Sequence, residues 1–304
     1  MTGRQVLAMD IGGTHTRIAL SDEAGNLSGY RNIPTISWAE TQPLTSLVRV
    51  IESFLEDNAL KSVDALSLGF PSAVDKARRT LISTPAIPAL DGIAIADRLA
   101  ERFPCPVFID RDVVMLFAHA EHVLRLPREG VTLAFFIGTG IGNVICLNGE
   151  IFNGANGIAG ELGHIPLPGK NEPCGCGGRG CAELYAAGRA LAAIRKRYFP
   201  QDKFEDLFVC HGNSESLSVY KDTLARVLAA EMVILDPDRV LLGGGVLHMP
   251  GFPIDELIDR IKPLLRSRDS AQRIQFLTAP DAQHAGVIGA GLYAFSKLKE
   301  DNIQ

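Results

Sequence analysis

The chain has 304 residues, of which 46% are hydrophobic and 21% are charged, and its formal net charge is −5. This composition can bury a large core and excludes an intrinsically disordered chain. The absence of a Lys/Arg-rich stripe argues against nucleic acid as the main partner, and no apolar run approaches the roughly 20 residues that a membrane helix needs. The amino terminus lacks the layout of a signal peptide, so we expect a cytoplasmic protein.

The opening segment is predicted to form a meander of three short strands. The strands are expected at residues 6–11, 17–20 and 27–33. The first strand ends in Asp10, and Gly12, Gly13 and Thr14 form the hairpin that follows. Such a turn can present backbone N–H groups to an anion. A tight hairpin without a ligand is the commoner explanation of adjacent glycines, so this turn alone is weak evidence for a phosphate site.

The next part of the chain alternates predicted helices and strands, a pattern typical of α/β proteins. Helices are expected at 40–58, 91–103 and 113–126, and strands at 63–70, 80–83 and 107–109. Asp110, Arg111 and Asp112 follow the last of these strands. The carboxyl end of a strand is where ligands bind in α/β sheets. A solvated ion-pair cluster is the alternative explanation for two aspartates beside an arginine.

Residues 132–147 repeat the opening pattern of strand, Gly/Thr turn and strand, and a hairpin at Asn148-Gly149 leads into a third strand. The run Ile137-Gly138-Thr139-Gly140 aligns with Ile11-Gly12-Gly13-Thr14 at an offset of 126 residues. An internal repeat indicates a duplicated supersecondary unit. Two glycine hairpins in two related lobes could face each other across a cleft and hold a polyphosphate from both sides.

A loop-rich segment, residues 160–183, combines glycines with potential metal ligands. The candidate ligands are His164, Cys174, Cys176 and Cys181. One imidazole and three thiolates make a closed tetrahedral set that is typical of structural zinc. Buried or redox-active thiols are the alternative, but three cysteines among glycines would make a poor core. A metal in this loop would also fix the positions of Glu161 and Glu183, which could otherwise be surface charges.

The last third of the chain is predicted to be mainly helical. Helices are expected at 184–198, 218–235, 253–265 and 285–298, strands at 239–242 and 273–277, and irregular structure at 199–217. The strand at 239–242 leads into Gly243, Gly244 and Gly245. Three glycines would let a flat ligand lie against the backbone, and a flexible loop is the alternative explanation.

Taken in order, these motifs resemble those of the ROK family of sugar kinases, in the hexokinase/Hsp70/actin superfamily. The resemblance covers essentially the whole chain. The matching motifs are Asp10–Thr14 and Phe136–Gly142 as phosphate loops, Glu161–His164 as the ExGH sugar motif, Cys174–Glu183 as the CxCGxxGCxE zinc motif and Leu242–Gly245 as the adenosine segment. The ExGH and cysteine motifs together are highly specific, whereas the glycine loops alone are not.

The resemblance implies an α/β fold of the ribonuclease-H-like type, with two lobes, a duplicated β-meander and a cleft between the lobes. It implies a small lobe of residues 1–115 with 287–304, and a large lobe of residues 116–286 that contains the zinc loop. It also implies a homodimer, with a sugar and ATP as small-molecule partners and with neither nucleic acid nor a membrane.

The resemblance assigns a role to each motif. Asp112 corresponds to the catalytic aspartate, which accepts the proton of the attacking sugar hydroxyl. Glu161, His164 and Glu183 correspond to sugar ligands, and His164 also binds the structural zinc with the three cysteines. The implied cofactors are ATP, Mg²⁺ and Zn²⁺. The residues expected near the nucleotide are Asp10, Gly12, Gly13, Thr14, Gly138, Thr139, Gly140, Gly243, Gly244 and Gly245.

The sequence departs from the family pattern around the sugar. Arg111 replaces the usual asparagine before the catalytic aspartate, and Ala86 replaces the asparagine that usually follows Pro85. The Arg-Asp-Val version is most similar to the D-allose kinases of the family. Allose differs from glucose in the orientation of one ring hydroxyl, which the long Arg111 side chain could reach. We therefore expect phosphorylation of the 6-hydroxyl of D-allose.

Three other functions fit the motifs less well. The first is a ROK kinase for glucose, fructose, N-acetylglucosamine or N-acetylmannosamine. The second is a sugar-sensing regulator, but the helix-turn-helix of such proteins would have to precede Asp10, where the sequence leaves too few residues. The third is a zinc-stabilised binding protein without catalysis, which the duplicated glycine turns disfavour.

Overall fold

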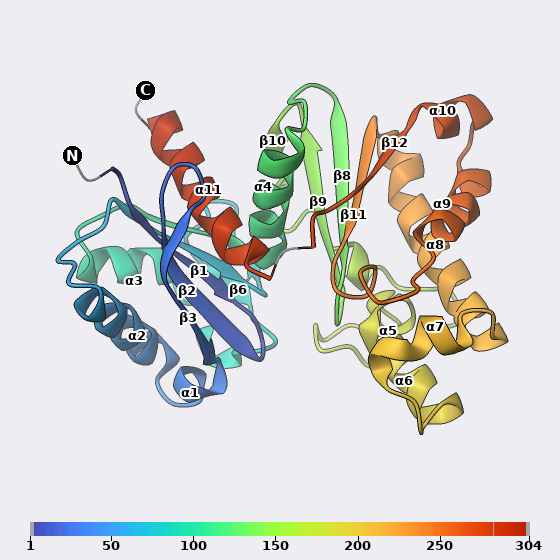
Figure 1. Cartoon of the computed structure of the whole chain (residues 1–304), viewed down its shortest axis with the longest axis horizontal. Helices are drawn as coiled ribbons and strands as arrows, with labels where there is room; N and C mark the ends of the chain where they lie inside the picture. The colour runs from blue at the N-terminus through green and yellow to red at the C-terminus, as the bar shows by residue number, and fades with distance from the viewer. Residues whose placement is uncertain (1–2, 282, 302–304) are drawn as a thin grey trace. The chain divides into compact units, whose positions relative to one another are not determined.

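The structure, a computed structural model, describes residues 3–281 and 283–301. These residues form two compact units, each of which is described by itself (Figure 1). The first unit comprises the described residues up to 126, residues 153–158 and the residues from 283 onward. The second comprises residues 127–152 and 159–281. The first unit therefore extends past the expected boundary at residue 115 and also includes a short segment from the middle of the chain.

A five-stranded mixed sheet forms the centre of the first unit. Its strands, in spatial order, are β3 (Leu27–Pro34), β2 (His15–Ser21), β1 (Val6–Ile11), β4 (Ala65–Phe70) and β7 (Val107–Arg111). The first three strands form an antiparallel meander, and β4 and β7 continue the sheet parallel to β1.

The second unit contains a sheet of the same order and the same strand directions. Its strands are β10 (Glu150–Ile151), β9 (Ile141–Leu147), β8 (Val131–Ile137), β11 (Arg239–Gly243) and β12 (Gln275–Thr278). β8, β9 and β10 form the meander, and β11 and β12 run parallel to β8. The predicted duplication of the meander is thus confirmed, and it extends to all five strands of each sheet.

The remaining elements of the first unit are five helices, one 3₁₀ turn and a small two-stranded sheet within the described residues. They are α1 (Ile36–Ala39), α2 (Pro43–Asp57), β5 (Ala73–Val74), β6 (Leu81–Ser83), η1 (Pro88–Leu90), α3 (Ile95–Arg102), α4 (Asp112–Leu124) and α11 (Ala285–Asp301). α3 begins at Ile95, four residues after the start of the helix predicted at 91–103. The Asp91 carboxylate instead accepts a hydrogen bond from the backbone N–H of Thr84.

The second unit adds more helical elements than predicted. They are η2 (Leu162–His164), α5 (Glu183–Ala186), α6 (Gly188–Tyr198), η3 (Phe204–Asp206), α7 (Leu207–His211), α8 (Glu215–Leu235), α9 (Ile254–Ile261), η4 (Lys262–Leu264) and α10 (Arg268–Arg273). The prediction of irregular structure at 199–217 was wrong, because α7 and the start of α8 lie there. The helix predicted at 184–198 is interrupted at Ala187, whose backbone is extended.

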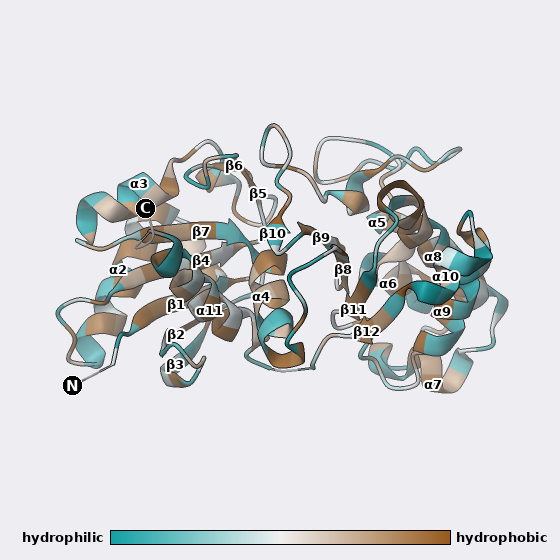
Figure 2. Ribbon diagram, turned by 90° about the horizontal axis from the view of Figure 1, so that it is seen from above, coloured by the Kyte–Doolittle hydropathy of each residue, from teal (hydrophilic) through white to brown (hydrophobic). Residues whose placement is uncertain are grey.

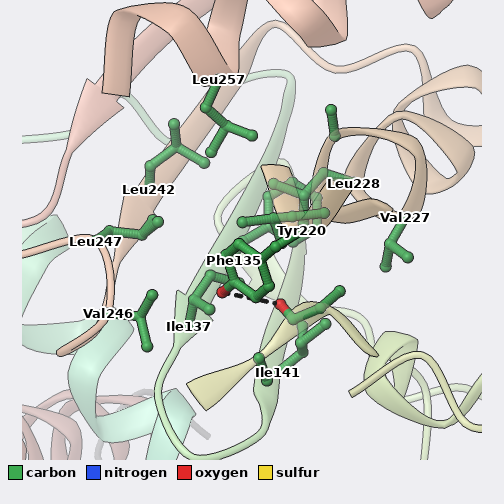
Figure 3. Close-up of a cluster of buried hydrophobic side chains, with 14 of the residues drawn as sticks. Phe135, Ile137, Ile141, Tyr220, Val227, Leu228, Leu242, Val246, Leu247 and Leu257 are labelled. Carbon is green, nitrogen blue, oxygen red and sulfur yellow. Dashed lines mark hydrogen bonds between the residues drawn. The ribbon is translucent and has the colours of Figure 1, made fainter. Parts of the chain in front are cut away.

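Each unit has its own core, built from the apolar faces of its sheet. Strand β4 is buried along its whole length, and the interior strands of both sheets are largely hydrophobic (Figure 2). In the second unit, Phe135 and Leu242 lie in a cluster with Tyr220 and Leu228 from α8 (Figure 3). The Tyr220 hydroxyl donates a hydrogen bond to the carbonyl of Ala186 at 3.4 Å. Within the described residues, the helices are too short or too polar to cross a membrane.

Replacing Gly289 with alanine is expected to destabilise the first unit. A Cβ atom at this position of α11 would overlap the backbone carbonyl oxygen of Met115 in α4. Alanine normally stabilises a helix relative to glycine by about 1 kcal/mol, but overpacking of this kind costs about 1–3 kcal/mol. We therefore expect a lower unfolding midpoint in a thermal or urea titration. An unchanged or higher midpoint would show that α11 and α4 are packed less closely than described.

Candidate active site

The first glycine turn connects β1 to β2 and is held by the segment that follows β3. The N–H of Gly12 donates to the carbonyl of His15 at 2.9 Å. The Thr35 hydroxyl donates to the carbonyl of Gly12 at 2.7 Å, and its N–H donates to the carbonyl of Thr14 at 2.9 Å. Residues 12–15 therefore form a turn whose backbone is held by hydrogen bonds from Thr35. Preorganised backbone N–H groups of this kind suit an anionic ligand.

Asp10 lies near the end of β1, next to this turn. Its Oδ2 atom accepts a hydrogen bond from Arg17 Nη1 at 3.0 Å, and the two residues are direct cross-strand partners. A Cβ atom on Gly286 would lie 2.5 Å from the Asp10 carboxylate, so the start of α11 packs closely against it. Burial raises the pKa of Asp10, and the charge of Arg17 opposes that shift. No motif of the sequence singles out Arg17, and its pairing with Asp10 follows from the observed register of β1 and β2.

Asp112 is the first residue of α4, immediately after β7 ends at Arg111. Its Oδ1 atom accepts a hydrogen bond from the N–H of Val113 at 2.8 Å, and a carboxylate at a helix amino terminus is electrostatically favourable. Gly69 of β4 approaches closely, since a Cβ atom there would lie 3.3 Å from the Asp112 Cα atom. Arg111 is buried, with an exposed fraction of only 3%. The strand-to-helix junction thus fixes Arg111 and Asp112 together.

The neighbouring Asp110 is buried and supports this junction. Its Oδ1 atom accepts a hydrogen bond from the N–H of Arg111 at 2.8 Å, and its Oδ2 atom accepts one from the Tyr293 hydroxyl at 3.0 Å. Burial, followed by the charge of Asp110, raises the pKa of Tyr293 well above its usual range. Tyr293 is therefore a neutral hydrogen-bond donor at physiological pH. The sequence carried no signal for this contact, which joins residues 183 positions apart.

The second glycine turn connects β8 to β9. Counted between paired residues, it is one residue shorter than the first, because Ile137 pairs with Ile141 whereas Ile11 pairs with Thr16. Gly138 donates its N–H to the carbonyl of Gly140 at 3.0 Å, and Gly188 donates its N–H to the carbonyl of Gly138 at 2.8 Å. The latter bond explains why the helix is interrupted just before Gly188. The Glu183 carboxylate packs directly against Gly140, where a Cβ atom would overlap it. Thr139 lies at the centre of the turn.

The Gly243–Gly245 segment is attached to the same end of β8. Gly244 has a φ of 94°, and a Cβ atom on it would lie 2.5 Å from the backbone nitrogen of Ile137. The N–H of Val246 donates to the carbonyl of Ile137 at 2.9 Å. Only glycine allows this backbone-to-backbone contact. The predicted adenosine segment therefore lies beside the second glycine turn within one unit.

The histidine and the three cysteines of the loop come together in space. One ligand atom from each of them lies within 4.8 Å of the others; the residues are His164, Cys174, Cys176 and Cys181. The Sγ atoms of Cys176 and Cys181 are 3.7 Å apart, as are Cys174 Sγ and His164 Nδ1. A tetrahedral zinc ion would place two sulfurs about 3.8 Å apart and a sulfur and a nitrogen about 3.6 Å apart. The donor set and its spacing therefore fit this metal.

The two glutamates predicted to bind sugar border the cysteine cluster. Glu161 Oε2 lies 3.7 Å from His164 Nε2, on the opposite side of the ring from Cys174. Glu183 Oε1 lies 3.5 Å from Cys174 Sγ, and Arg189 Nη1 lies 3.5 Å from the same oxygen. The second unit therefore gathers the predicted sugar ligands, the cysteines and the second glycine turn into one region. The first unit gathers Asp10, the first glycine turn and the Arg111–Asp112 junction.

Comparisons with known proteins place this architecture in one family. The model of the ROK family matches residues 6–296. The chain is 29% identical to the N-acetylgalactosamine kinase AgaK of Shewanella sp. ANA-3, with 93% of this chain and 94% of that protein aligned. It is 28% identical to an N-acetyl-D-glucosamine kinase of Photobacterium profundum, over 96% of this chain and 98% of that protein.

A solved structure gives the same result for the fold. The ROK hexokinase of Thermus thermophilus superposes with a TM-score of 0.76 and 27% sequence identity, over 97% of this chain and 99% of that chain. The similarity extends over nearly the full length of each compared protein, so it includes both sheets and the cysteine loop. The chain therefore belongs to the ROK family, among its sugar kinases.

Proposed function

We propose that this sugar kinase transfers the γ-phosphoryl group of ATP to the 6-hydroxyl of a free hexose, and that D-allose is its preferred substrate. The observation that carries the proposal is the position of Asp112 at the first residue of α4, directly after the buried Arg111. The named relatives, which are kinases of N-acetylhexosamines and a hexokinase, support a hexose-type acceptor.

The glycine turns supply the groups that phosphoryl transfer needs for positioning. Backbone N–H groups of Gly13 and Thr14 in the first unit and of Thr139 and Gly140 in the second would bind phosphate oxygens of ATP. Asp10 is the carboxylate that would hold Mg²⁺, through water molecules that this ion retains. When bound, Mg²⁺ neutralises charge on the phosphates. The Gly243–Gly245 segment would receive the adenosine.

Asp112 would act on the sugar. A carboxylate that accepts a hydrogen bond from the attacking 6-hydroxyl orients the oxygen toward the γ-phosphorus. It takes the hydroxyl proton as the new P–O bond forms, while the bond from the γ-phosphorus to the β–γ bridging oxygen breaks and ADP leaves. The N–H of Val113 already donates a hydrogen bond to Oδ1 of the Asp112 carboxylate and so restrains its orientation. Glu161 and Glu183 would accept hydrogen bonds from ring hydroxyls and so set the orientation of the sugar.

The cysteine cluster would bind a structural zinc ion. All four ligands come from the protein, so no coordination position remains for substrate or water. Nδ1 of His164 would bind the metal, and the neutral ring would then carry its proton on Nε2, which lies 3.7 Å from Glu161 Oε2. The metal would therefore orient the sugar loop without taking part in the chemical step.

Arg111 is the residue that we propose selects allose. Substituting Arg111 with asparagine, the usual residue of the family, is expected to lower the ratio of kcat/KM for D-allose to that for D-glucose by about 10-fold to 200-fold. In this proposal the long arginine side chain would donate a hydrogen bond to the hydroxyl whose orientation differs between the two sugars. Coupled ADP-release assays with each sugar measure the ratio, which does not depend on the fraction of folded enzyme. A ratio equal to that of the wild type would contradict the role of Arg111.

The N-acetylhexosamine kinases among the relatives favour a second candidate substrate. In that case an N-acetylhexosamine would show the highest kcat/KM. The position of phosphorylation is tested separately with a 6-deoxyhexose, which lacks the attacking hydroxyl. We expect the 6-deoxy analogue of the best substrate to bind without being phosphorylated. ADP release above the hydrolysis background with this analogue would exclude the 6-hydroxyl as the acceptor.

A further inference from the structure

Arg78 is a largely buried arginine in the turn between β5 and β6, and its backbone has a φ of 54°. Its side chain is 12% exposed. Left-handed backbone is unfavourable for residues larger than glycine and persists only where surrounding contacts hold it. The contacts of the guanidinium group supply that restraint, and they involve parts of the chain that are far apart in sequence.

One side of the guanidinium group holds the segment 153–158. Arg78 Nη1 donates to the carbonyl of Gly157 at 3.0 Å, and Nη2 donates to Asn153 Oδ1. Nη1 also lies within hydrogen-bond distance of the carbonyls of Val74, at 2.9 Å, and Asp75, at 3.2 Å. Arg78 therefore connects its own turn to a segment more than seventy residues away.

The segment 153–158 packs backbone to backbone against the same turn. Gly157 has a φ of 87°, and a Cβ atom on it would lie 2.5 Å from the carbonyl oxygen of Val74. In the chain, residues of the second unit both precede and follow this segment. Glu161 follows its last residue after only two intervening residues. The contact with Arg78 thus anchors the chain just before the sugar motif begins.

The other side of the guanidinium group faces the junction that carries Asp112. Arg78 Nε lies 3.4 Å from Asp110 Oδ2, and Asp110 in turn accepts the backbone N–H of Arg111. The Asp110 side chain is 2% exposed, and a buried carboxylate is costly without a cationic partner. Loss of Arg78 would therefore disturb the residue that holds the backbone directly before Asp112.

We propose that Arg78 is a positioning residue that connects the Arg111–Asp112 junction with the segment leading into the sugar motif. The inference rests on the proposed function, because one positioned element carries the predicted base and the other leads into the motif of a predicted sugar ligand, Glu161. Arginine suits this task because its planar group offers five N–H donors in fixed directions. A lysine would retain the charge but could not serve both sides in the same geometry.

The test uses the Arg78→Gly variant. Glycine tolerates positive φ, so this change relieves the backbone and removes only the side chain. We expect kcat/KM for the sugar to fall by about 10-fold to 100-fold, because small displacements of positioned groups are costly, while KM for ATP stays near the wild-type value. Guanidinium chloride at non-denaturing millimolar concentration is expected to restore part of the activity, and equal NaCl is not.

Arg79 provides the matched control. It is the next residue of the same turn, but its side chain is 36% exposed and pairs with Asp97 at the surface. Arg79→Gly is expected to retain sugar kinetics near the wild type and to show no guanidinium rescue. Arg78→Lys, which retains the charge, is expected to lose less activity than Arg78→Gly. Wild-type kcat/KM in Arg78→Gly would overturn the inference.

Hydrogen exchange gives a readout that does not depend on catalysis. Backbone amides of residues 154–161 are expected to exchange faster in Arg78→Gly than in the wild type or in Arg79→Gly. If the wild type phosphorylates no sugar, the proposed function fails, and faster exchange in the variant still supports the connection made by Arg78. Unchanged exchange in this segment would overturn the connection itself.

Discussion

Replacing Asp112 with asparagine is expected to lower kcat by about 10²-fold to 10⁴-fold, the range by which a positioned general base accelerates a reaction. Asparagine has nearly the same shape and can still accept the N–H of Val113, which bonds to Asp112 Oδ1 at 2.8 Å. It cannot, however, take a proton from the sugar hydroxyl. The Kd for the sugar, measured by calorimetry, should change far less than kcat, because most of the proposed hydroxyl contacts involve other residues.

The control for this substitution is Asp57→Asn. Asp57 is an exposed aspartate in the first unit that pairs with Arg31 at 2.8 Å, away from the catalytic junction. The Asp57→Asn variant should retain the kcat and the sugar Kd of the wild type. If Asp112→Asn keeps a kcat close to that of the wild type while the protein is folded, Asp112 is not the base and the proposed mechanism is wrong.

Replacing Cys181 with serine is expected to remove the metal and to have the second-largest effect. Cys181 is 2% exposed, and its thiol lies 3.7 Å from that of Cys176. A hydroxyl is a much poorer zinc ligand than a thiolate, and structural zinc sites contribute directly to folding. We expect less than one zinc ion per chain by mass spectrometry of the metal. The thermal midpoint should fall, and KM for the sugar should rise by at least about 10-fold, as for loss of ligand-orienting contacts.

The exposed Cys210 provides a matched control for the cysteine cluster. It lies outside the four-ligand set, so Cys210→Ser should retain the metal content and the sugar KM of the wild type. Treatment of the wild type with a chelator should reproduce the effect of Cys181→Ser, and added zinc should reverse it. Full activity and an unchanged midpoint in chelated, metal-free protein would contradict a structural metal.

The duplicated meander could be predicted from the sequence because it depends on local signals, whereas its extension to five strands in each sheet could not. Alternating apolar strands, short hairpins and a repeated Gly/Thr turn are all visible within windows of about twenty residues. In the structure, the five strands of the second sheet have the same order as the corresponding five strands of the first sheet. The candidate metal site of the cysteine loop could also be predicted, because its four candidate ligands are close in sequence and are cysteine and histidine residues.

The supporting contacts of the site could not be predicted, because they depend on tertiary packing. Tyr293 reaches Asp110 across 183 residues, and Arg78 reaches Gly157 across 79. Neither residue belongs to a motif, and each lies in a segment whose own pattern predicts only a helix or a turn. Gly286, which packs against Asp10, lies in a segment whose pattern predicts only a helix. Such residues become visible only when the elements are assembled.

Errors in the predicted elements have a similar origin. The segment 199–217 reads as polar and irregular, yet Leu207 and Phe208 are buried and anchor α7 to the core of the second unit. Tertiary burial thus outweighed the weak local propensity. The interruption at Ala187 allows Gly188 to bond to Gly138, which places the start of α6 against the second glycine turn.

The most direct test of the account is a coupled ADP-release assay with ATP and Mg²⁺, using zinc-loaded protein and a panel of free hexoses and N-acetylhexosamines. We expect sugar-dependent ADP release with the highest kcat/KM for D-allose. A preference for glucose or an N-acetylhexosamine would agree with sugar kinase activity but would contradict the proposed role of Arg111 in selecting allose. Absence of sugar-dependent ADP release from folded, zinc-loaded protein with every sugar of the panel would contradict the proposed function as a whole.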